Sequence, residues 1–135
     1  MTTEINRELI RQFFANYGEQ KIAEVIDVMH DDVQWWINGK PHLYAFSGIK
    51  TKADMMAVGK KLTEALPNWM KVEVRSIIAD GDRVSVEWSC DGVTNTGKRY
   101  QNDFVFIFLI RDGKIVECRE YYDLLHANEV FPELA

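Results

Sequence analysis

Cysteine and long apolar runs are scarce in this sequence, and each scarcity excludes a class of protein. The two cysteines, Cys90 and Cys118, are too few for the disulfide framework of a small secreted protein, so we expect free thiols in a reducing compartment. No stretch approaches the ~18 apolar residues of a membrane span, and residues 1–6 lack the basic start of a signal peptide. We therefore expect a cytoplasmic protein without a membrane partner.

Positive charge is scarce as well. The chain has 16 Lys and Arg residues against 21 Asp and Glu residues, which gives a formal net charge of -5. The basic residues are scattered along the sequence rather than clustered, so they do not form a stripe that could follow a phosphate backbone. We expect no nucleic-acid partner.

Motifs for bound cofactors are missing too. The sequence has no Gly-x-Gly-x-x-Gly or Walker loop for a nucleotide, and no Gly-x-Ser-x-Gly elbow for a serine hydrolase. His30, His42 and His126 lie far apart, without the spacing of metal ligands. The sequence thus predicts no metal and no cofactor, which leaves cofactor-free chemistry or simple binding.

What the chain does have is enough apolar surface for one domain. Its 135 residues are 47% hydrophobic and 27% charged, close to the average usage of soluble proteins. Domains most often contain about 100 to 150 residues. We therefore expect residues 1–135 to form a single domain with its own core.

Apolar spacing predicts three helices in the first half of the chain. Residues 4–17 carry apolar side chains three or four positions apart, which is the pattern of an amphipathic helix. A second helix is expected over about residues 22–30. A capping box formed by Thr51 and Asp54 favours a third helix, which ends before Pro67.

Five strands are expected around and after the third helix. The first covers residues 32–38, which are rich in strand-forming residues. Four more are separated by Gly- or Asn-containing turns typical of hairpins, and they cover residues 70–79, 83–94, 98–110 and 114–123. This order of elements is an α+β pattern, with the helices on one face of the sheet and a short helical turn in the tail.

Alternation along the strands separates inward from outward side chains. On the strand over residues 83–94, the inward set is Val84, Val86, Trp88 and Cys90. On the next strand, one face carries Tyr100, Asn102, Phe104, Phe106 and Phe108. Its other face is apolar as well, with Val105, Ile107 and Leu109. An apolar outer face needs a cover, and a second copy of the sheet is the simplest one, so we expect a homodimer.

The last strand places a carboxylate on a core-like face. If Val116 and Cys118 point inward, then Glu120 and Tyr122 do so too, whereas the opposite facing would turn Glu117 and Arg119 inward. An ionised acid in an apolar interior is costly unless it is paired or hydrogen-bonded. Glu120 is therefore the strongest signal of a functional site in the chain.

The arrangement resembles the SnoaL-like family of the nuclear transport factor 2-like superfamily, which includes polyketide cyclases and ketosteroid isomerases. The resemblance covers nearly the whole chain and is most specific over residues 100–106 and 111–123. It implies a cone-shaped, strongly curved, mixed or antiparallel β-sheet wrapped around helices. Such a cystatin-like α+β barrel encloses an apolar pocket for a small molecule, and the resemblance also implies a homodimer.

By resemblance, Glu120 falls where SnoaL-like cyclases and limonene-epoxide-hydrolase-like enzymes carry an acid in the pocket, which makes it the candidate acid/base. The hydrolases also carry an Arg and an Asp where this chain has Trp88 and Cys90. The ketosteroid isomerases carry a pocket acid where this chain has Ile37 and Asn38. These departures disfavour both epoxide hydrolysis and the ketosteroid isomerase chemistry.

Aromatic and polar residues complete the candidate site. The expected pocket walls are Trp35, Trp69, Trp88 and Phe104. The side chains expected to orient a substrate by hydrogen bonds are Tyr100, Asn102 and Tyr122. His42, in the loop over residues 39–48, is a candidate proton partner. The alternatives are ordinary core packing for the aromatic walls, internal hydrogen bonding for the polar side chains, and a plain surface position for His42.

Three functions stay open at this point. The leading hypothesis is a cofactor-independent isomerase or cyclase that moves a proton on a small apolar carbonyl compound, with Glu120 as the acid/base. The second is a non-catalytic binding protein of the same fold, in which Glu120 only anchors a hydrophobic metabolite. The third is a dimerisation module whose pocket is filled by its own Trp and Phe side chains.

Overall fold

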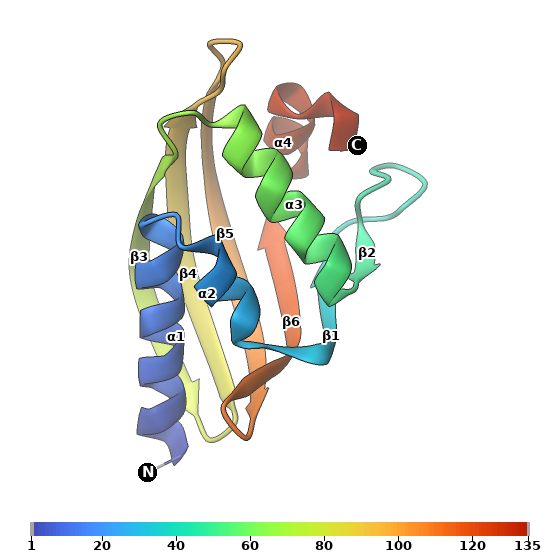
Figure 1. Cartoon of the computed structure of the whole chain (residues 1–135). Coiled ribbons are helices and arrows are strands. Elements are labelled where there is room, and N and C mark those ends of the chain that lie inside the picture. Colours follow the sequence, from blue (N-terminus) through green and yellow to red (C-terminus); the bar gives the residue numbers. More distant parts are fainter. Residues whose placement is uncertain (1, 135) are drawn as a thin grey trace.

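The first half of the chain is mainly helical and the second half consists mainly of strands (Figure 1). The computed structural model describes residues 2–134. In this range the helices are α1 (Thr2–Gly18), α2 (Ile22–Asp27), α3 (Lys52–Ala65) and α4 (Leu124–Val130), followed by a 3-10 turn at Pro132–Leu134. The strands are β1 (Met29–Ile37), β2 (Gly48–Lys50), β3 (Met70–Asp80), β4 (Arg83–Val93), β5 (Arg99–Arg111) and β6 (Lys114–Tyr122). None of these helices is long and apolar enough to cross a membrane.

The six strands form one mixed sheet in the order β2-β1-β6-β5-β4-β3. Strand β1 runs parallel to β6, and every other neighbouring pair is antiparallel. The sheet curves strongly in Figure 1, with β2 and β3 at its two open edges. The expected α+β fold with a curved mixed sheet is confirmed, but the sheet does not close into a barrel.

The helices cover the concave face of the sheet. Helix α1 packs against β3 and β4, α3 packs against β1, and α2 contacts both α1 and α3. Helix α4 contacts β5. Figure 1 shows α1, α2 and α3 on the same side of the sheet, so the helices within residues 2–134 leave the convex face uncovered.

Local sequence signals set the ends of several elements. At the start of α3, Thr51 Oγ1 accepts a hydrogen bond from the Asp54 N–H at 3.1 Å, and Asp54 Oδ2 accepts one from the Thr51 N–H at 2.8 Å. The expected capping box is therefore confirmed. In the three hairpin turns Gly81, Gly97 and Gly113 adopt positive φ angles, a conformation that costs glycine little.

Two stretches differ from the sequence-based expectation. Helix α2 ends at Asp27, and the first strand begins already at Met29, because the Met29 backbone pairs with Ile115 of β6. Strand β2 was not predicted, since its three residues are too few to show an alternating pattern. It forms by antiparallel pairing with the end of β1, where Ile37 lies opposite Gly48. Pairing between distant segments explains both differences.

The inward faces that alternation predicts on β4 and β5 are confirmed, whereas on β6 a register shift buries Ile115 in place of Val116 before Cys118 and Glu120 face inward as expected. Val84, Val86, Trp88 and Cys90 are each at most 2% exposed, whereas Glu87 between them faces solvent. On β5, the buried set includes Tyr100, Asn102, Phe104, Phe106 and Phe108. The concave face thus carries a continuous layer of aromatic side chains under the helices.

Candidate functional site

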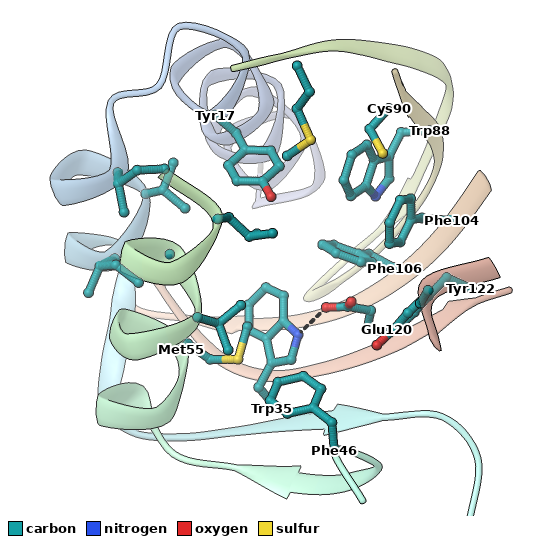
Figure 2. Close-up of a pocket in the computed structure, with 18 of the residues that line it drawn as sticks. Tyr17, Trp35, Phe46, Met55, Trp88, Cys90, Phe104, Phe106, Glu120 and Tyr122 are labelled. Atoms are coloured by element: carbon teal, nitrogen blue, oxygen red, sulfur yellow. Dashed lines mark hydrogen bonds between the residues drawn. The ribbon is translucent and has the colours of Figure 1, made fainter. Parts of the chain in front are cut away.

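A cavity of about 110 Å³ lies between the concave face of the sheet and the helices (Figure 2). Eleven of the 23 described residues that line it are aromatic, and Glu120 alone among them carries a charge. The aromatic ones are Phe13, Tyr17, Trp35, Tyr44, Phe46, Trp88, Tyr100, Phe104, Phe106, Tyr122 and Phe131. A dry apolar cavity of ~150 Å³ can hold a benzene ring. This cavity therefore suits a ligand of about one ring.

Glu120 reaches the cavity from β6 because it alternates with outward-facing neighbours on that strand. Its Cα partners across the sheet are Ile37 of β1 and Phe106 of β5, so apolar side chains flank it on both sides. Trp35 Nε1 donates a hydrogen bond to Glu120 Oε1 at 2.7 Å. Within residues 2–134 no second hydrogen bond reaches this carboxylate, so Oε2 is available to a ligand (Figure 2).

The surroundings of Glu120 change its proton affinity. Burial away from water disfavours the charged form and raises the pKa of Glu120 to about 7, although the Trp35 N–H bond acts in the opposite direction. A carboxyl group with a pKa near neutrality is populated in both protonation states under ordinary conditions. Glu120 can therefore accept a proton and return it.

Four tyrosine residues also belong to the lining, and they come from different parts of the fold. Tyr17 lies on α1, Tyr44 on the loop between β1 and β2, Tyr100 on β5 and Tyr122 at the end of β6. Burial raises the pKa of each hydroxyl above its ordinary value. All four stay protonated at neutral pH and can donate hydrogen bonds.

The Tyr17 hydroxyl is placed on the helical side of the cavity. Figure 2 shows it pointing into the cavity from α1, while Glu120 enters from the sheet on the other side. The described part of the chain provides no hydrogen-bond partner for this hydroxyl, although the Tyr17 backbone carbonyl accepts from Trp69 Nε1 at 2.7 Å. A ligand between the two walls would meet a hydroxyl and a carboxyl group from opposite sides.

The two walls of the cavity differ in their chemistry. On the sheet side, Trp88 stacks on Phe104 with ring centroids 4.2 Å apart and an interplanar angle of 8°, and Phe106 meets Trp88 edge to face. On the helix side the wall is mostly aliphatic, with Ile22, Val25, Ile26, Met55, Val58 and Leu62. The cavity therefore has an aromatic wall on the sheet side and a more flexible aliphatic wall on the helix side.

Six of the nine side chains that the sequence predicts for the site do line the cavity. They are Glu120, Trp35, Trp88, Tyr100, Phe104 and Tyr122. The inward facing of Glu120, on which the site depends, is the one found in the structure. The remaining three, Trp69, Asn102 and His42, are not part of the lining.

Each of these three side chains has another position. Trp69 adopts a positive φ of 58° and packs edge to face behind Tyr17. Asn102 is buried, but its amide links β5 to the start of α4 through hydrogen bonds with the backbone of Asp123. His42 is exposed on its loop. The two buried residues therefore support the site from outside, and the loop contributes Tyr44 instead of His42.

Sequence reasoning missed Tyr17 and Tyr44. Tyr17 belongs to the apolar stripe of α1, and this stripe could have drawn attention to a tyrosine among aliphatic and phenylalanine residues. Tyr44 lies in a loop without periodicity, so no pattern in the sequence points to it.

Metal and thiol chemistry find no support in this cavity. Among residues 2–134, no three His, Cys, Asp or Glu side chains come together as metal ligands. Cys90 lines the cavity, but burial raises its pKa to about 12, so the thiol stays neutral and is a weak nucleophile.

Comparison with known families places this fold and cavity in context. The sequence profile described as the SnoaL-like domain matches residues 10–118. The chain belongs to the SnoaL-like domain family. The family resemblance inferred from the sequence is thereby confirmed.

This SnoaL-like domain is similar to one curated protein over part of its sequence and to solved structures over nearly its whole length. The uncharacterized protein YesE of Bacillus subtilis is 39% identical over 54 residues, a match that spans 39% of this chain and only 37% of YesE. The crystal structure of TerC, co-crystallized with polyporic acid, has a TM-score of 0.77 at 26% identity, covering 95% of this chain and 98% of TerC. A candidate isomerase from Bacillus subtilis has a TM-score of 0.81 at 22% identity, covering 98% and 96% of the two chains.

Proposed function

We propose that this SnoaL-like domain moves a proton on a small apolar carbonyl compound, as an isomerase or a cyclase does, with Glu120 as the acid/base. The observation that carries the proposal is a carboxyl group inside an apolar cavity, with one hydrogen bond from Trp35 and one free oxygen. The co-crystal of TerC with polyporic acid supports a small-molecule ligand for this fold. No cofactor takes part in the proposed reaction.

The proposed step begins with Glu120 Oε2 removing a proton from the carbon next to the carbonyl group. The electrons of the broken C–H bond form a C=C bond, and the carbonyl oxygen becomes an enolate. The Tyr17 hydroxyl, on the opposite wall, donates a hydrogen bond to that oxygen as its charge develops. In an isomerisation of a β,γ-unsaturated ketone, the enolate is conjugated with the existing C=C bond, and Glu120 returns the proton to the far carbon of that system. In a cyclisation, the enolate carbon attacks a second carbonyl carbon, and the alkoxide oxygen formed there takes the proton from Glu120.

The other lining residues take supporting roles in this proposal. Trp35 orients the Glu120 carboxylate, Trp88 and Phe104 form the aromatic wall, and the hydroxyls of Tyr100 and Tyr122 orient the substrate. The apolar surroundings also keep bulk water from competing for the proton.

Deuterium exchange tests the proposal even though the natural substrate is not identified. The protein is incubated in D2O with a panel of single-ring ketones, and deuterium uptake next to the carbonyl group is followed by proton NMR. We expect catalysed exchange by the wild-type protein and a loss of about 100-fold or more in Glu120→Gln, since positioned acid/base groups contribute ~10²–10⁴ in rate. Gln keeps the size of the side chain and an acceptor for Trp35.

Glu117→Gln is the matched control, because Glu117 lies on the same strand outside the cavity lining. This variant should exchange at the wild-type rate. Equal exchange by wild-type protein and Glu120→Gln would exclude Glu120 as the acid/base. Ligand binding without any exchange would indicate a binding protein instead of an enzyme.

We also propose that the convex face of the sheet binds a second copy of this chain. The strand register aligns one transverse row of outward side chains across all six strands: Ile49, Trp36, Arg119, Ile107, Ser85 and Ile78. Ile49 is 57% exposed and Ile78 is 69% exposed at the two ends of this row. Trp and Arg are enriched among the residues that dominate binding energy at interfaces.

The oligomeric state tests this second proposal. Size-exclusion chromatography with light scattering should give the mass of a dimer for the wild-type protein and that of a monomer for Ile107→Lys, which places a second positive charge opposite Arg119 in the centre of the row. Leu125→Glu, on α4 and 86% exposed, is the control and should leave the dimer intact. A monomeric wild-type protein would rule the dimer out.

A further inference from the structure

The cavity can carry a negative charge, but its lining has no positive charge to balance it. None of the described lining residues is Lys, Arg or His. When Glu120 is ionised, it receives only the Trp35 N–H bond at Oε1, and Oε2 has no partner in the part of the chain that the structure describes. Buried charges are normally paired, and they are costly when left unpaired. The residues that the structure describes therefore leave one oxygen of the Glu120 carboxylate without a partner.

The aromatic lining favours a partner of positive charge. The face of an aromatic ring is electron-rich, so it attracts ammonium groups. One lining ring already shows this contact, since Lys50 Nζ lies 4.7 Å from the centroid of the Phe46 ring. A carboxylate ligand, in contrast, would meet the like charge of Glu120, with no cation among the described lining residues to pair with it.

We propose that the cavity binds small organic ammonium ions in preference to neutral and anionic ligands of the same size. The ammonium N–H donates a hydrogen bond to Glu120 Oε2, and the hydrocarbon part of the ligand lies against Trp88 and Phe104. The cavity volume of about 110 Å³ limits the ligand to about one ring, as in an arylalkylammonium ion. The inference requires only the position of Glu120 and does not depend on proton transfer by that residue.

Glu120 is the group that sets the charge of the cavity near neutral pH. Burial raises the pKa of five other titratable groups around the cavity, which keeps them neutral there: Tyr17, Tyr44, Tyr100, Tyr122 and Cys90. The buried Cys118 thiol next to Glu120 on the inner face also has a raised pKa. His126 stacks on the Tyr100 ring with centroids 5.4 Å apart, and it is not a lining residue. Ammonium binding should therefore strengthen as Glu120 ionises.

Three matched probes test the charge preference. Benzylammonium, benzyl alcohol and benzoate have the same ring and similar size, and their binding is measured by calorimetry and by tryptophan fluorescence. At about pH 8.5, where Glu120 with a pKa of about 7 is ionised and the amine is protonated, we expect benzylammonium to bind at least ~10-fold more tightly than benzyl alcohol. Benzoate should bind most weakly of the three.

Substitutions and changes of pH show whether Glu120 is the group that causes the preference for benzylammonium. The preference for benzylammonium should fall to less than about twofold in Glu120→Gln, and in the wild-type protein at about pH 5.5, where Glu120 is protonated. Glu117→Gln should keep the wild-type preference, and thermal melts check that both variants are folded. Benzoate binding as tightly as benzylammonium, a preference that survives in Glu120→Gln, or the absence of binding by all three probes would each overturn the inference.

The outcome is separable from that of the deuterium-exchange experiment. Ammonium preference without exchange would keep this inference and reject the acid/base role of Glu120. Exchange without ammonium preference would do the reverse. If both hold, benzylammonium should inhibit exchange competitively, because it occupies Oε2.

Discussion

The concave and convex faces of the sheet use the same residue types in opposite ways. On the concave face, Trp35 donates a hydrogen bond to the buried Glu120. On the convex face, the next residue, Trp36, lies against the exposed guanidinium group of Arg119, with Arg119 Cζ 3.9 Å from the ring centroid. Tyr122 lines the cavity, while Tyr121 accepts a hydrogen bond from Arg119 Nε on the outside.

Adjacent positions thus experience different environments because strand side chains alternate between the two faces. The outer charge remains in water, where its contacts with Trp36 and Tyr121 contribute little stability. The inner charge has lost its water and gained one hydrogen bond, so its ionisation becomes costly and its pKa rises. We therefore expect proton transfer on the concave face and contact with a second copy of the chain on the convex face.

Among the changes that separate the two faces, the largest should be in how the free energy of unfolding depends on pH, through the buried Glu120. The folded protein holds the Glu120 proton more tightly than the unfolded chain, since the pKa is raised from 4.5 to about 7. This contribution to the free energy of unfolding is fully present below about pH 4.5 and is lost as the pH rises to about 7.

Glu120→Gln isolates this contribution. Between pH 4 and pH 8 the wild-type protein should lose about 3 kcal/mol of stability relative to the variant. Urea denaturation at a series of pH values gives the difference. Parallel pH profiles for the two proteins would contradict the raised pKa.

A smaller effect is expected from the pair Trp35→Phe and Trp36→Phe. Trp35→Phe removes the only hydrogen bond that residues 2–134 give to the Glu120 carboxylate and leaves space in the core, so it should lower the free energy of unfolding by about 2 kcal/mol. It should also raise the pKa of Glu120 further, because the N–H bond favours the ionised form. Trp36→Phe should cost less than about 1 kcal/mol and leave that pKa unchanged. Equal effects of the two substitutions on the Glu120 pKa would remove the distinction between the faces.

The smallest effect should come from Arg119→Ala. Its guanidinium group is solvent-exposed on the convex face, where cation–π contacts are worth about 0.5–1 kcal/mol. Urea denaturation of the variant should show a loss within this range, measured at a protein concentration where both proteins have the same oligomeric state. A loss above about 2 kcal/mol would mean that this cluster is part of the folding core.

The sequence predicts the hairpin half of this fold closely and the rest less well. Strands β3 to β6 are bounded by turns with Gly81, Gly97 and Gly113, so local backbone preferences determine where they end. Strand β2 and the start of β1 depend on pairing with remote segments, which leaves no local signal. The register that joins Met29 to Ile115 is an example of such a tertiary effect.

The candidate site also contains residues that the sequence predicts well and residues that it does not. Alternation is enough to place Glu120, Trp88 and Phe104 on the inner face, because the strand period is two residues. It is not enough for Trp69, which precedes β3 in a left-handed conformation and turns toward Tyr17. The inward position of Tyr44 depends on the path of a loop, which the sequence pattern does not reveal.

The pKa of Glu120 in the folded protein is the measurement that tests the central claim most directly. Protein labelled with carbon-13 at the glutamate carboxyl groups is titrated by NMR, and Glu120→Gln identifies the Glu120 signal. We expect a midpoint near 7, with burial as the cause. A midpoint below about 5, typical of an exposed glutamate, would contradict the buried, unpaired carboxylate on which the proposed chemistry and the proposed ammonium binding both rest.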